Sequence, residues 1–324
     1  MKKVLRIILF LLIAIVLIIG GVIGYVSLML PNVPVDESLK VEITPERVER
    51  GKYLANNVMG CMDCHAERDK SLYTMPVFKE TRGLGGSLWS EAQGFPGEMY
   101  AVNITPYHLQ EWSDGELFRA ITAGVSRDGS ALFPIMPYLM YGKLPQEDIY
   151  DVIAYLRTLE PERSEHPSRK MEFPLSLIVN LMPKEGTHHI ASSTDPVKFG
   201  EYIITQAVCF DCHTPMEGGR FVEGMDYAGG LEFQLETGGV VRAANITPDR
   251  ETGIGNWTKE AFVAKFKSFQ DTLFFPHKIK SGQLNTEMPW TYYANMKEEE
   301  IGAIYEYLMS LEPISNKVEK FTAP

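Results

Sequence analysis

The sequence predicts a mostly α-helical protein in which two tandem small domains follow one N-terminal transmembrane helix. Three observations support this fold class. The first 30 residues contain a long uncharged apolar run, the remainder contains one unit twice, and each copy ends in an amphipathic helical pattern. At 324 residues, the chain is long enough for two or three domains of ordinary size.

The N-terminal segment, residues 1–30, is expected to anchor the chain in a membrane. Lys2, Lys3 and Arg6 precede an uncharged apolar run that ends at Leu30, and a helix needs only about 20 residues to cross a bilayer. A cleaved signal peptide is the alternative, although the end of the run offers no small-x-small cleavage site. Because the cations come first, we expect the N-terminus to stay in the cytoplasm and the rest to be exported.

The charge balance narrows the classes of partner. The chain has 42 acidic and 31 basic side chains, which gives a formal net charge of −11. An acidic surface argues against nucleic acid or anionic lipid as a partner. A basic protein partner stays open.

The exported part contains one unit twice, and we expect each copy to form one domain. The expected boundaries are 44–161 for the first domain, 162–194 for the linker and 195–313 for the second domain. Matching segments support these boundaries, including Ala101–Pro106 with Ala243–Pro248 and Met136–Pro161 with Met288–Pro313.

Each unit contains one Cys-x-x-Cys-His pattern, and the two patterns use all four cysteines. They are Cys61-Met62-Asp63-Cys64-His65 and Cys209-Phe210-Asp211-Cys212-His213. This pattern is the attachment signature of covalently bound haem c. Two thiols on one side of a helical turn can form thioethers with the porphyrin vinyl groups, and the histidine then ligates the iron. We therefore predict two haem c groups, with His65 and His213 as proximal iron ligands.

Other uses of the cysteines are less consistent with the pattern. A disulfide in each motif or a thioredoxin-like site would not explain why a histidine follows both pairs. A zinc site of four cysteines usually has its pairs closer in sequence than Cys64 and Cys209. Since all four thiols are used, none remains as a thiolate ligand to iron.

Met136 and Met288, each followed by proline, are the predicted distal ligands of the first and second haem iron. Thioether sulfur suits a haem iron that histidine holds on the other side. These methionines match each other in the repeat, whereas the two further Met-Pro dipeptides do not. Ordinary core methionines are one alternative, and ligation by His108 or His277 is another.

Short helices complete each expected domain. Apolar side chains recur at helical spacing through Ile149–Leu159 and Ile301–Leu311. Thr44, Ser113 and Thr258 are the expected N-caps of further helices. Gly51 and Gly200 would let the last helix of the same unit approach closely. The glycine-rich stretches after the motifs are expected to be loops or a short hairpin.

The linker contains an unusually apolar stretch, residues 173–182. We expect it to cover the interface between the two domains, because contiguous exposed apolar surface is rare in soluble proteins. Contact with the membrane surface or with a partner subunit is the alternative.

The chain resembles the class I cytochrome c family, and especially the multi-haem cytochrome c subunits of bacterial membrane-bound alcohol and sugar-acid dehydrogenases. The resemblance covers roughly residues 44–313. It is carried by Gly-x-Tyr-Leu before Cys61, both attachment motifs, Asn245–Trp257 and Met136-Pro137-Tyr138. It implies His/Met-ligated haems, a mostly helical fold and electron relay from a periplasmic dehydrogenase toward quinone or an oxidase. The chain departs from the family in having two haem motifs where three are common, and Met288-Pro-Trp where Met-Pro-Tyr is frequent.

The expected function is electron transfer, with no catalytic residue. Two six-coordinate haems would leave no open iron for a substrate. The expected partners are a dehydrogenase, a quinol-oxidising complex or a terminal oxidase. The expected location is the bacterial cytoplasmic membrane, with one span and the haem domains on the periplasmic side. The alternative is a di-haem redox enzyme of the peroxidase type, which needs one open iron and an acid–base group beside it.

Overall fold

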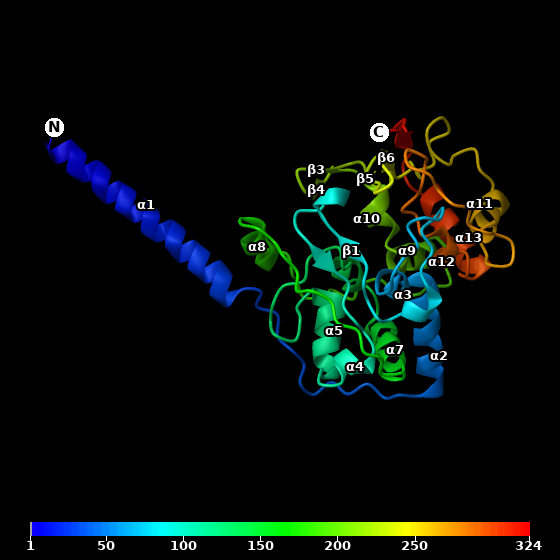
Figure 1. The fold of residues 1–324 in the computed structure, drawn as a ribbon, viewed down its shortest axis with the longest axis horizontal. Helices are drawn as coiled ribbons and strands as arrows, with labels where there is room; N and C mark the ends of the chain where they lie inside the picture. Colours follow the sequence, from blue (N-terminus) through cyan, green and yellow to red (C-terminus); the bar gives the residue numbers. More distant parts are fainter. Residues whose placement is uncertain (1) are drawn as a thin grey trace.

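The computed structural model describes residues 2–324. Over these residues the chain is mostly helical, and its strands form three small antiparallel sheets, so the predicted fold class is confirmed. Helix α1 (Lys2–Met29) projects away from the folded body (Figure 1). It is long and apolar enough to cross a membrane, with a mean hydropathy of 3.2.

The first repeat unit is organised around two packed helices, α2 (Pro45–Tyr53) and α7 (Gln146–Arg157). As expected, Thr44 caps α2 by accepting a hydrogen bond from a backbone N–H, and Ser113 caps α5 in a capping box. The other elements are the π-helical turn η1 (Leu54–Val58), α3 (Cys61–Cys64), η2 (Lys79–Thr81), β1 (Leu88–Trp89), η3 (Glu91–Gln93), β2 (Met99–Tyr100), α4 (Pro106–Leu109), α5 (Asp114–Ala123) and α6 (Tyr138–Tyr141).

The second repeat unit follows the same plan, with α9 (Pro196–Gln206) packed against α13 (Glu298–Met309). Thr258 caps α11, as expected, and α11 also packs on α13. The other elements are α10 (Cys209–His213), β3 (Met216–Glu217), β4 (Arg220–Phe221), β5 (Glu232–Gln234), β6 (Val240–Arg242), α11 (Lys259–Lys267), α12 (Trp290–Tyr293) and the C-terminal strand β7 (Phe321–Thr322).

The glycine-rich stretches form short antiparallel pairs, which agrees with the expected hairpins. Leu88 of β1 lies opposite Tyr100 of β2. In the second unit Phe233 of β5 lies opposite Val241 of β6, and β7 extends this sheet to the order β5-β6-β7.

Glycine makes the closest helix contact in each unit, as the sequence predicts. A Cβ atom on Gly51 would lie 1.8 Å from the carbonyl oxygen of Asp151, and one on Gly200 would lie 2.1 Å from that of Ala303. No real side chain tolerates such distances. Only glycine therefore lets the first and last helices of each unit pack at this separation.

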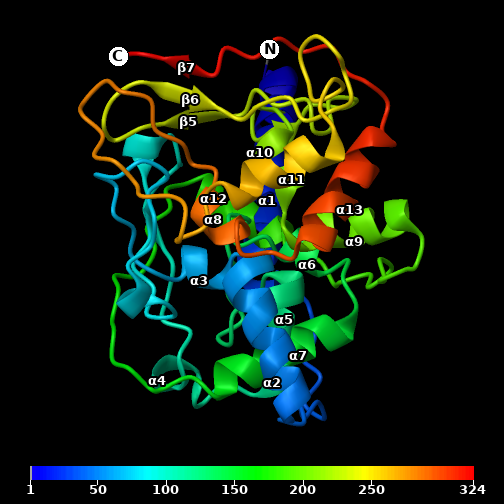
Figure 2. The same cartoon turned by 90° about the vertical axis from the view of Figure 1, so that its right-hand side faces the viewer.

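The two units contact each other through matching tyrosines. Tyr53 at the end of α2 donates a hydrogen bond to the Glu300 carboxylate on α13. In return, Tyr202 on α9 donates to the Asp148 carboxylate on α7 at 2.6 Å. Both tyrosines and both carboxylates occupy equivalent positions in the repeat, so the contact is reciprocal and the units are related by an approximate two-fold axis. Figure 2 shows α2 and α7 in one half of the body and α9 and α13 in the other.

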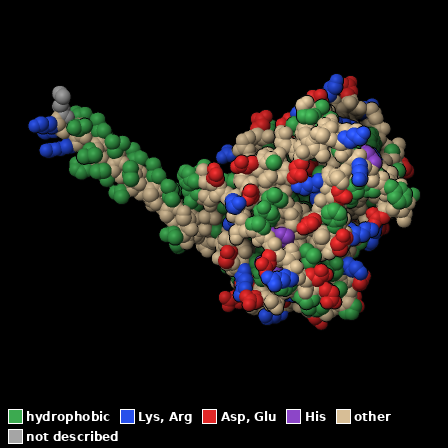
Figure 3. Space-filling model, in the orientation of Figure 1, with side chains coloured by type: hydrophobic (Ala, Val, Ile, Leu, Met, Phe, Trp, Pro, Cys, Tyr) green, Lys and Arg blue, Asp and Glu red, His purple; other side chains and the backbone are tan. Residues whose placement is uncertain are grey.

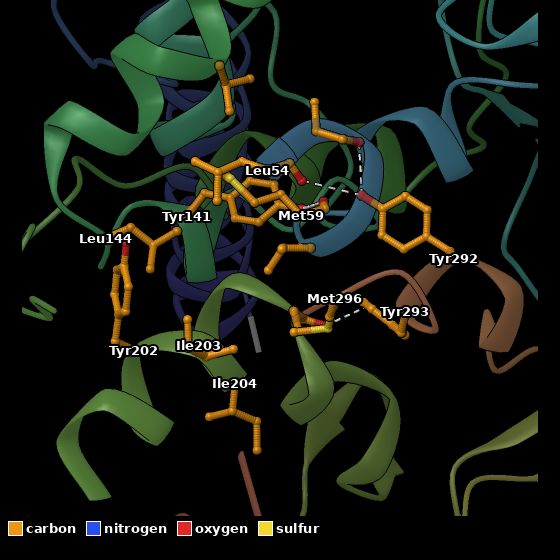
Figure 4. Close-up of a cluster of buried hydrophobic side chains, with 14 of the residues drawn as sticks. Leu54, Met59, Tyr141, Leu144, Tyr202, Ile203, Ile204, Tyr292, Tyr293 and Met296 are labelled. Carbon is orange, nitrogen blue, oxygen red and sulfur yellow. Dashed lines mark hydrogen bonds between the residues drawn. The ribbon is translucent and has the colours of Figure 1, made fainter. Parts of the chain in front are cut away.

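Apolar side chains of both units form one continuous core. Figure 4 shows Leu54, Met59 and Leu144 of the first unit facing Ile203 and Met296 of the second. All five side chains are almost completely buried. The units therefore share a core in addition to their polar contacts, which fixes their relative position.

The linker differs from the expectation. Its apolar stretch forms α8 (Leu175–Ile178) and η4 (Val179–Leu181), which contact α1. Phe173 and Leu181 are 72% and 54% exposed. Their exposure contradicts the expectation that the stretch covers the interface between the units, since Tyr53, Tyr202 and the shared core already fill that interface.

Candidate haem sites

In the first unit, the cysteine motif begins immediately after a sharp turn of the chain. Gly60 has a left-handed φ of 69° and separates η1 from α3. Cys61 and Cys64 lie in the single turn of α3, which the backbone N–H of His65 closes by donating to the carbonyl of Cys61 at 2.8 Å. Helical spacing thus places both thiols on the same side of the turn.

The second motif has the same form with a less favourable residue at the turn. Val208, at the position equivalent to Gly60, has a left-handed φ of 47° before α10. A β-branched residue rarely adopts this conformation, which costs about 1–3 kcal/mol. The packing around Cys209–His213 therefore imposes the turn. The left-handed conformation is the same before both motifs, although the residue is glycine at 60 and valine at 208.

Both motif histidines are oriented by a backbone carbonyl at the same position of the repeat. His65 Nδ1 lies 2.7 Å from the carbonyl oxygen of Val102, and His213 Nδ1 lies 2.8 Å from that of Ala244. Because a carbonyl only accepts hydrogen bonds, Nδ1 carries the proton and the Nε2 lone pair is available for a metal. Burial lowers the pKa of both histidines, which favours the neutral form that binds iron.

Each of these carbonyls precedes an asparagine that ties its loop to the end of the unit. Asn103 donates to the carbonyl of Glu162 at 2.8 Å, and Asn245 donates to that of Ile314 at 2.7 Å. Both asparagines also accept hydrogen bonds from the threonine two residues later. The repeated Asn-Ile-Thr-Pro run therefore holds the carbonyl that orients the histidine. Sequence reasoning found the repeat of this run but missed the role of the preceding carbonyl.

The two predicted methionine ligands lie on equivalent loops. Met136 and Met288 are partly buried and pack against the core. Each is followed by proline and a short helix, α6 or α12. The structure therefore gives both methionines the same local backbone.

A tyrosine ties each methionine loop to the cysteine motif of the same unit. Tyr141 on α6 donates a hydrogen bond to the carbonyl of Met59, two residues before Cys61. Tyr293 on α12 donates to the carbonyl of Ala207, two residues before Cys209, at 2.7 Å. The tyrosines sit five residues after the methionines, so each methionine loop is attached to its own haem motif.

These groups fit haem c in both units. All four cysteines are free thiols in residues 2–324, as thioether formation requires. Each pair stands on one turn beside an imidazole with a free Nε2 lone pair, and a thioether lies on a loop tied to that turn. Across the same residues, no group of three or more His, Cys, Asp or Glu side chains is arranged to hold a metal ion.

The other histidines of the units have different surroundings. His277 stacks on Tyr73 with ring centroids 5.1 Å apart. The rings of His108 and Trp112 have their centroids 6.3 Å apart. They occupy unrelated places in the two units, so they do not reproduce the symmetry of the cysteine motifs and methionines.

Comparison with characterised proteins gives three informative relatives. The chain is 28% identical over 294 residues to the cytochrome c subunit of an alcohol dehydrogenase (quinone) from Gluconacetobacter polyoxogenes, covering 85% of this chain and 58% of that subunit. It is 25% identical over 285 residues to the gluconate 2-dehydrogenase cytochrome c subunit of Pantoea cypripedii, covering 82% and 59%. The resemblance to dehydrogenase cytochrome c subunits is confirmed. A diheme cytochrome c-type protein from Cereibacter sphaeroides is 26% identical over 170 residues, covering 49% of this chain and 54% of that protein.

These relatives support an electron-transfer haem cytochrome, because the named subunits belong to dehydrogenase complexes as their cytochrome components. The chain spans little more than half the length of the subunits it matches. No protein-family model matches it. The match therefore covers only part of each relative.

Proposed function

We propose that this cytochrome is a membrane-anchored di-haem c-type electron carrier, which passes electrons between redox partners at the periplasmic face of the bacterial cytoplasmic membrane. The observation that carries the proposal is the duplicated orientation of the motif histidines by the carbonyls of Val102 and Ala244. Two copies of a Cys-x-x-Cys-His turn, each with its histidine held as a neutral ligand, suit two covalent haems.

In this proposal each repeat unit is one cytochrome c domain, 44–161 and 195–313. Cys61 and Cys64 hold the first haem, and Cys209 and Cys212 hold the second. The axial ligands are His65 with Met136 in the first domain, and His213 with Met288 in the second. Bound haem supplies one-electron chemistry, since its iron cycles between the ferrous and ferric states. The protein contributes fixed ligands and a largely apolar surrounding.

Contacts between the units support transfer of electrons within the chain. Tyr292, on the helix after Met288, accepts a hydrogen bond from the backbone N–H of Gly60 at 2.7 Å. Gly60 immediately precedes the first cysteine motif. Tyr292 also donates a hydrogen bond to the carbonyl of Ala55, just before the same motif, at 2.8 Å. The methionine loop of the second unit thus contacts the chain beside the cysteine motif of the first, which favours a relay between two centres.

The anchoring part of the proposal rests on α1. Its three cations lie at the end remote from the body, and the apolar surface between them and the body is exposed (Figure 3). Such a helix is stable in a bilayer with the cations on the cytoplasmic side. The haem domains then face the periplasm, where a dehydrogenase can donate electrons and a quinone-linked complex or terminal oxidase can accept them.

The test is a count of covalent haems followed by a redox titration of the membrane-extracted protein. We expect the denatured chain to retain two haems, and the native protein to accept two electrons in two one-electron steps. One haem per chain, or haem lost on denaturation, would contradict the di-haem assignment. Turnover of hydrogen peroxide at enzymatic rates would instead favour the peroxidase alternative.

A further inference from the structure

The apolar stretch of the linker, residues 173–182, forms a surface that neither haem unit uses. The stretch contains no charged residue. Its side chains Phe173, Ile178 and Leu181 are 72%, 41% and 54% exposed. We call these three side chains the linker patch. Three large exposed apolar side chains so close together in the sequence favour a contact with a membrane or a partner.

The segment that carries the linker patch is attached to the end of α1. Both α8 and η4 contact α1, and α8 lies between the end of α1 and the body in Figure 1. Asn180 donates a hydrogen bond to the backbone carbonyl of Val26 at 3.3 Å. Val26 is only 7% exposed, whereas its neighbours Tyr25 and Leu28 are 58% and 83% exposed. The depth of Val26 in the membrane therefore sets the depth of the linker patch.

The length of α1 sets that depth. A helix rises 1.5 Å per residue, so Val26 lies about 30 Å along the axis from Arg6, which equals the thickness of a hydrocarbon core. With Arg6 at the cytoplasmic interface, Val26 reaches the outer interface. Tyr25 fits this level, because tyrosine prefers the boundary between acyl chains and headgroups.

We propose that the linker patch lies in the outer interface of the same bilayer that α1 crosses, and so docks the haem body on the membrane as a second contact. The inference rests on the proposed anchoring by α1. A patch without charge needs no anionic lipid, which agrees with the acidic character of the chain. Two contacts, one spanning and one interfacial, hold the body in one orientation toward the membrane, whereas α1 alone would leave it free to rotate.

Cysteine accessibility in the full-length holoprotein tests this docking. Phe173→Cys and Leu181→Cys place thiols in the linker patch. Phe275→Cys is the matched control, because Phe275 is an apolar side chain that is 81% exposed. It follows α11 in the sequence, and α11 lies on the side of the body remote from α1 (Figure 1). Leu17→Cys marks the middle of α1. Each variant is placed in phosphatidylcholine nanodiscs without partner proteins and treated with a charged, membrane-impermeant maleimide, with complete labelling after denaturation as the reference.

We expect labelling at 173 and 181 to be slower than at 275 by on the order of tenfold or more, because an apolar environment suppresses the reactive thiolate. Labelling at 17 should be slower still. Slow labelling at 17 with rapid labelling at 173 and 181 would overturn the docking and leave the anchor intact, and the patch would then be free for a protein partner. Rapid labelling at 17 would overturn the anchor itself.

Discussion

The two repeat units hold their cysteine motifs alike but surround their methionines differently. Tyr138, two residues after Met136, is fully buried, and its ring fills the space beside Gly124. Trp290, two residues after Met288, is partly exposed and stacks on Phe269 with ring centroids 5.0 Å apart. Duplication has thus kept the methionine positions while their surroundings diverged. Since the surroundings tune a haem iron, we expect the two haems to differ in reduction potential.

A second difference concerns the contact between the units. Tyr292 of the second unit bonds to the first unit through the N–H of Gly60 and the carbonyl of Ala55. The equivalent residue of the first unit is Met140, which is buried and has no hydroxyl. The tyrosine–carboxylate contacts are therefore reciprocal, whereas the hydrogen bonds from the helix after the methionine to the opposite unit are made only by the second unit.

The largest expected effect comes from removing one attachment motif. Cys61→Ala with Cys64→Ala should lower the covalent haem content from two per chain to one, and Cys209→Ala with Cys212→Ala should do the same. The pyridine haemochrome spectrum of the purified, denatured chain measures this. Two haems remaining in either variant would contradict the assignment of that motif.

Removing one methionine should change the reduction potential of one haem and leave that of the other unchanged. Met136→Ala should lower the potential of the first haem by on the order of 0.1 V or more, since axial ligands span about 0.8 V, and Met288→Ala should do so for the second. Spectroelectrochemical titration resolves the two steps. Met182→Ala, a Met-Pro position outside both units, is the control and should shift neither. If both potentials stay unchanged in both methionine variants, these methionines are not ligands.

Replacing the glycine at the helix contact should destabilise the protein by a similar amount in either unit. Gly51→Ala and Gly200→Ala each place a methyl group against a backbone carbonyl, and overpacking typically costs about 1–3 kcal/mol of unfolding free energy. Denaturant unfolding measures the loss. Gly20→Ala in α1 is the control, because a Cβ there would meet nothing within 4 Å. A neutral effect at Gly51 or Gly200 would show that the helices can separate without cost.

The last comparison tests the hydrogen bond that only the second unit makes. Tyr292→Phe leaves the N–H of Gly60 without its partner, so we expect a loss of about 1–3 kcal/mol in unfolding free energy. Met140→Leu conserves volume at the equivalent position and should cost less than about 1.5 kcal/mol. Thermal unfolding of the two variants makes the comparison. Equal stability of Tyr292→Phe and the wild type would show that this hydrogen bond does not stabilise the protein.

Local patterns in the sequence predicted the parts of the fold that depend on local physics. Thr44 caps α2 because its hydroxyl reaches a backbone donor three residues away, and Gly51 is required where two helices meet. Contacts between units were not predictable, because Tyr53 and Glu300 meet only after both units have folded and docked. The linker was also misjudged, since an apolar stretch does not show whether protein or membrane covers it.

For the candidate sites, the sequence predicts side chains but does not reveal the backbone groups that surround them. The cysteines, histidines and methionines occupy matching positions in the two copies of the repeat, so the sequence alone reveals them. The carbonyls of Val102 and Ala244 carry no side-chain signal, so only the folded chain shows that they orient the histidines.

Two closed haems, each held by histidine and methionine, would make this chain an electron carrier. The most direct measurement is a visible and near-infrared spectrum of the oxidised protein, followed by reduction and addition of carbon monoxide. We predict a ferric sulfur–iron charge-transfer band from both haems and no spectral shift with carbon monoxide. A carbon monoxide shift on one haem would reveal an open iron, contradict the carrier account and favour a di-haem redox enzyme.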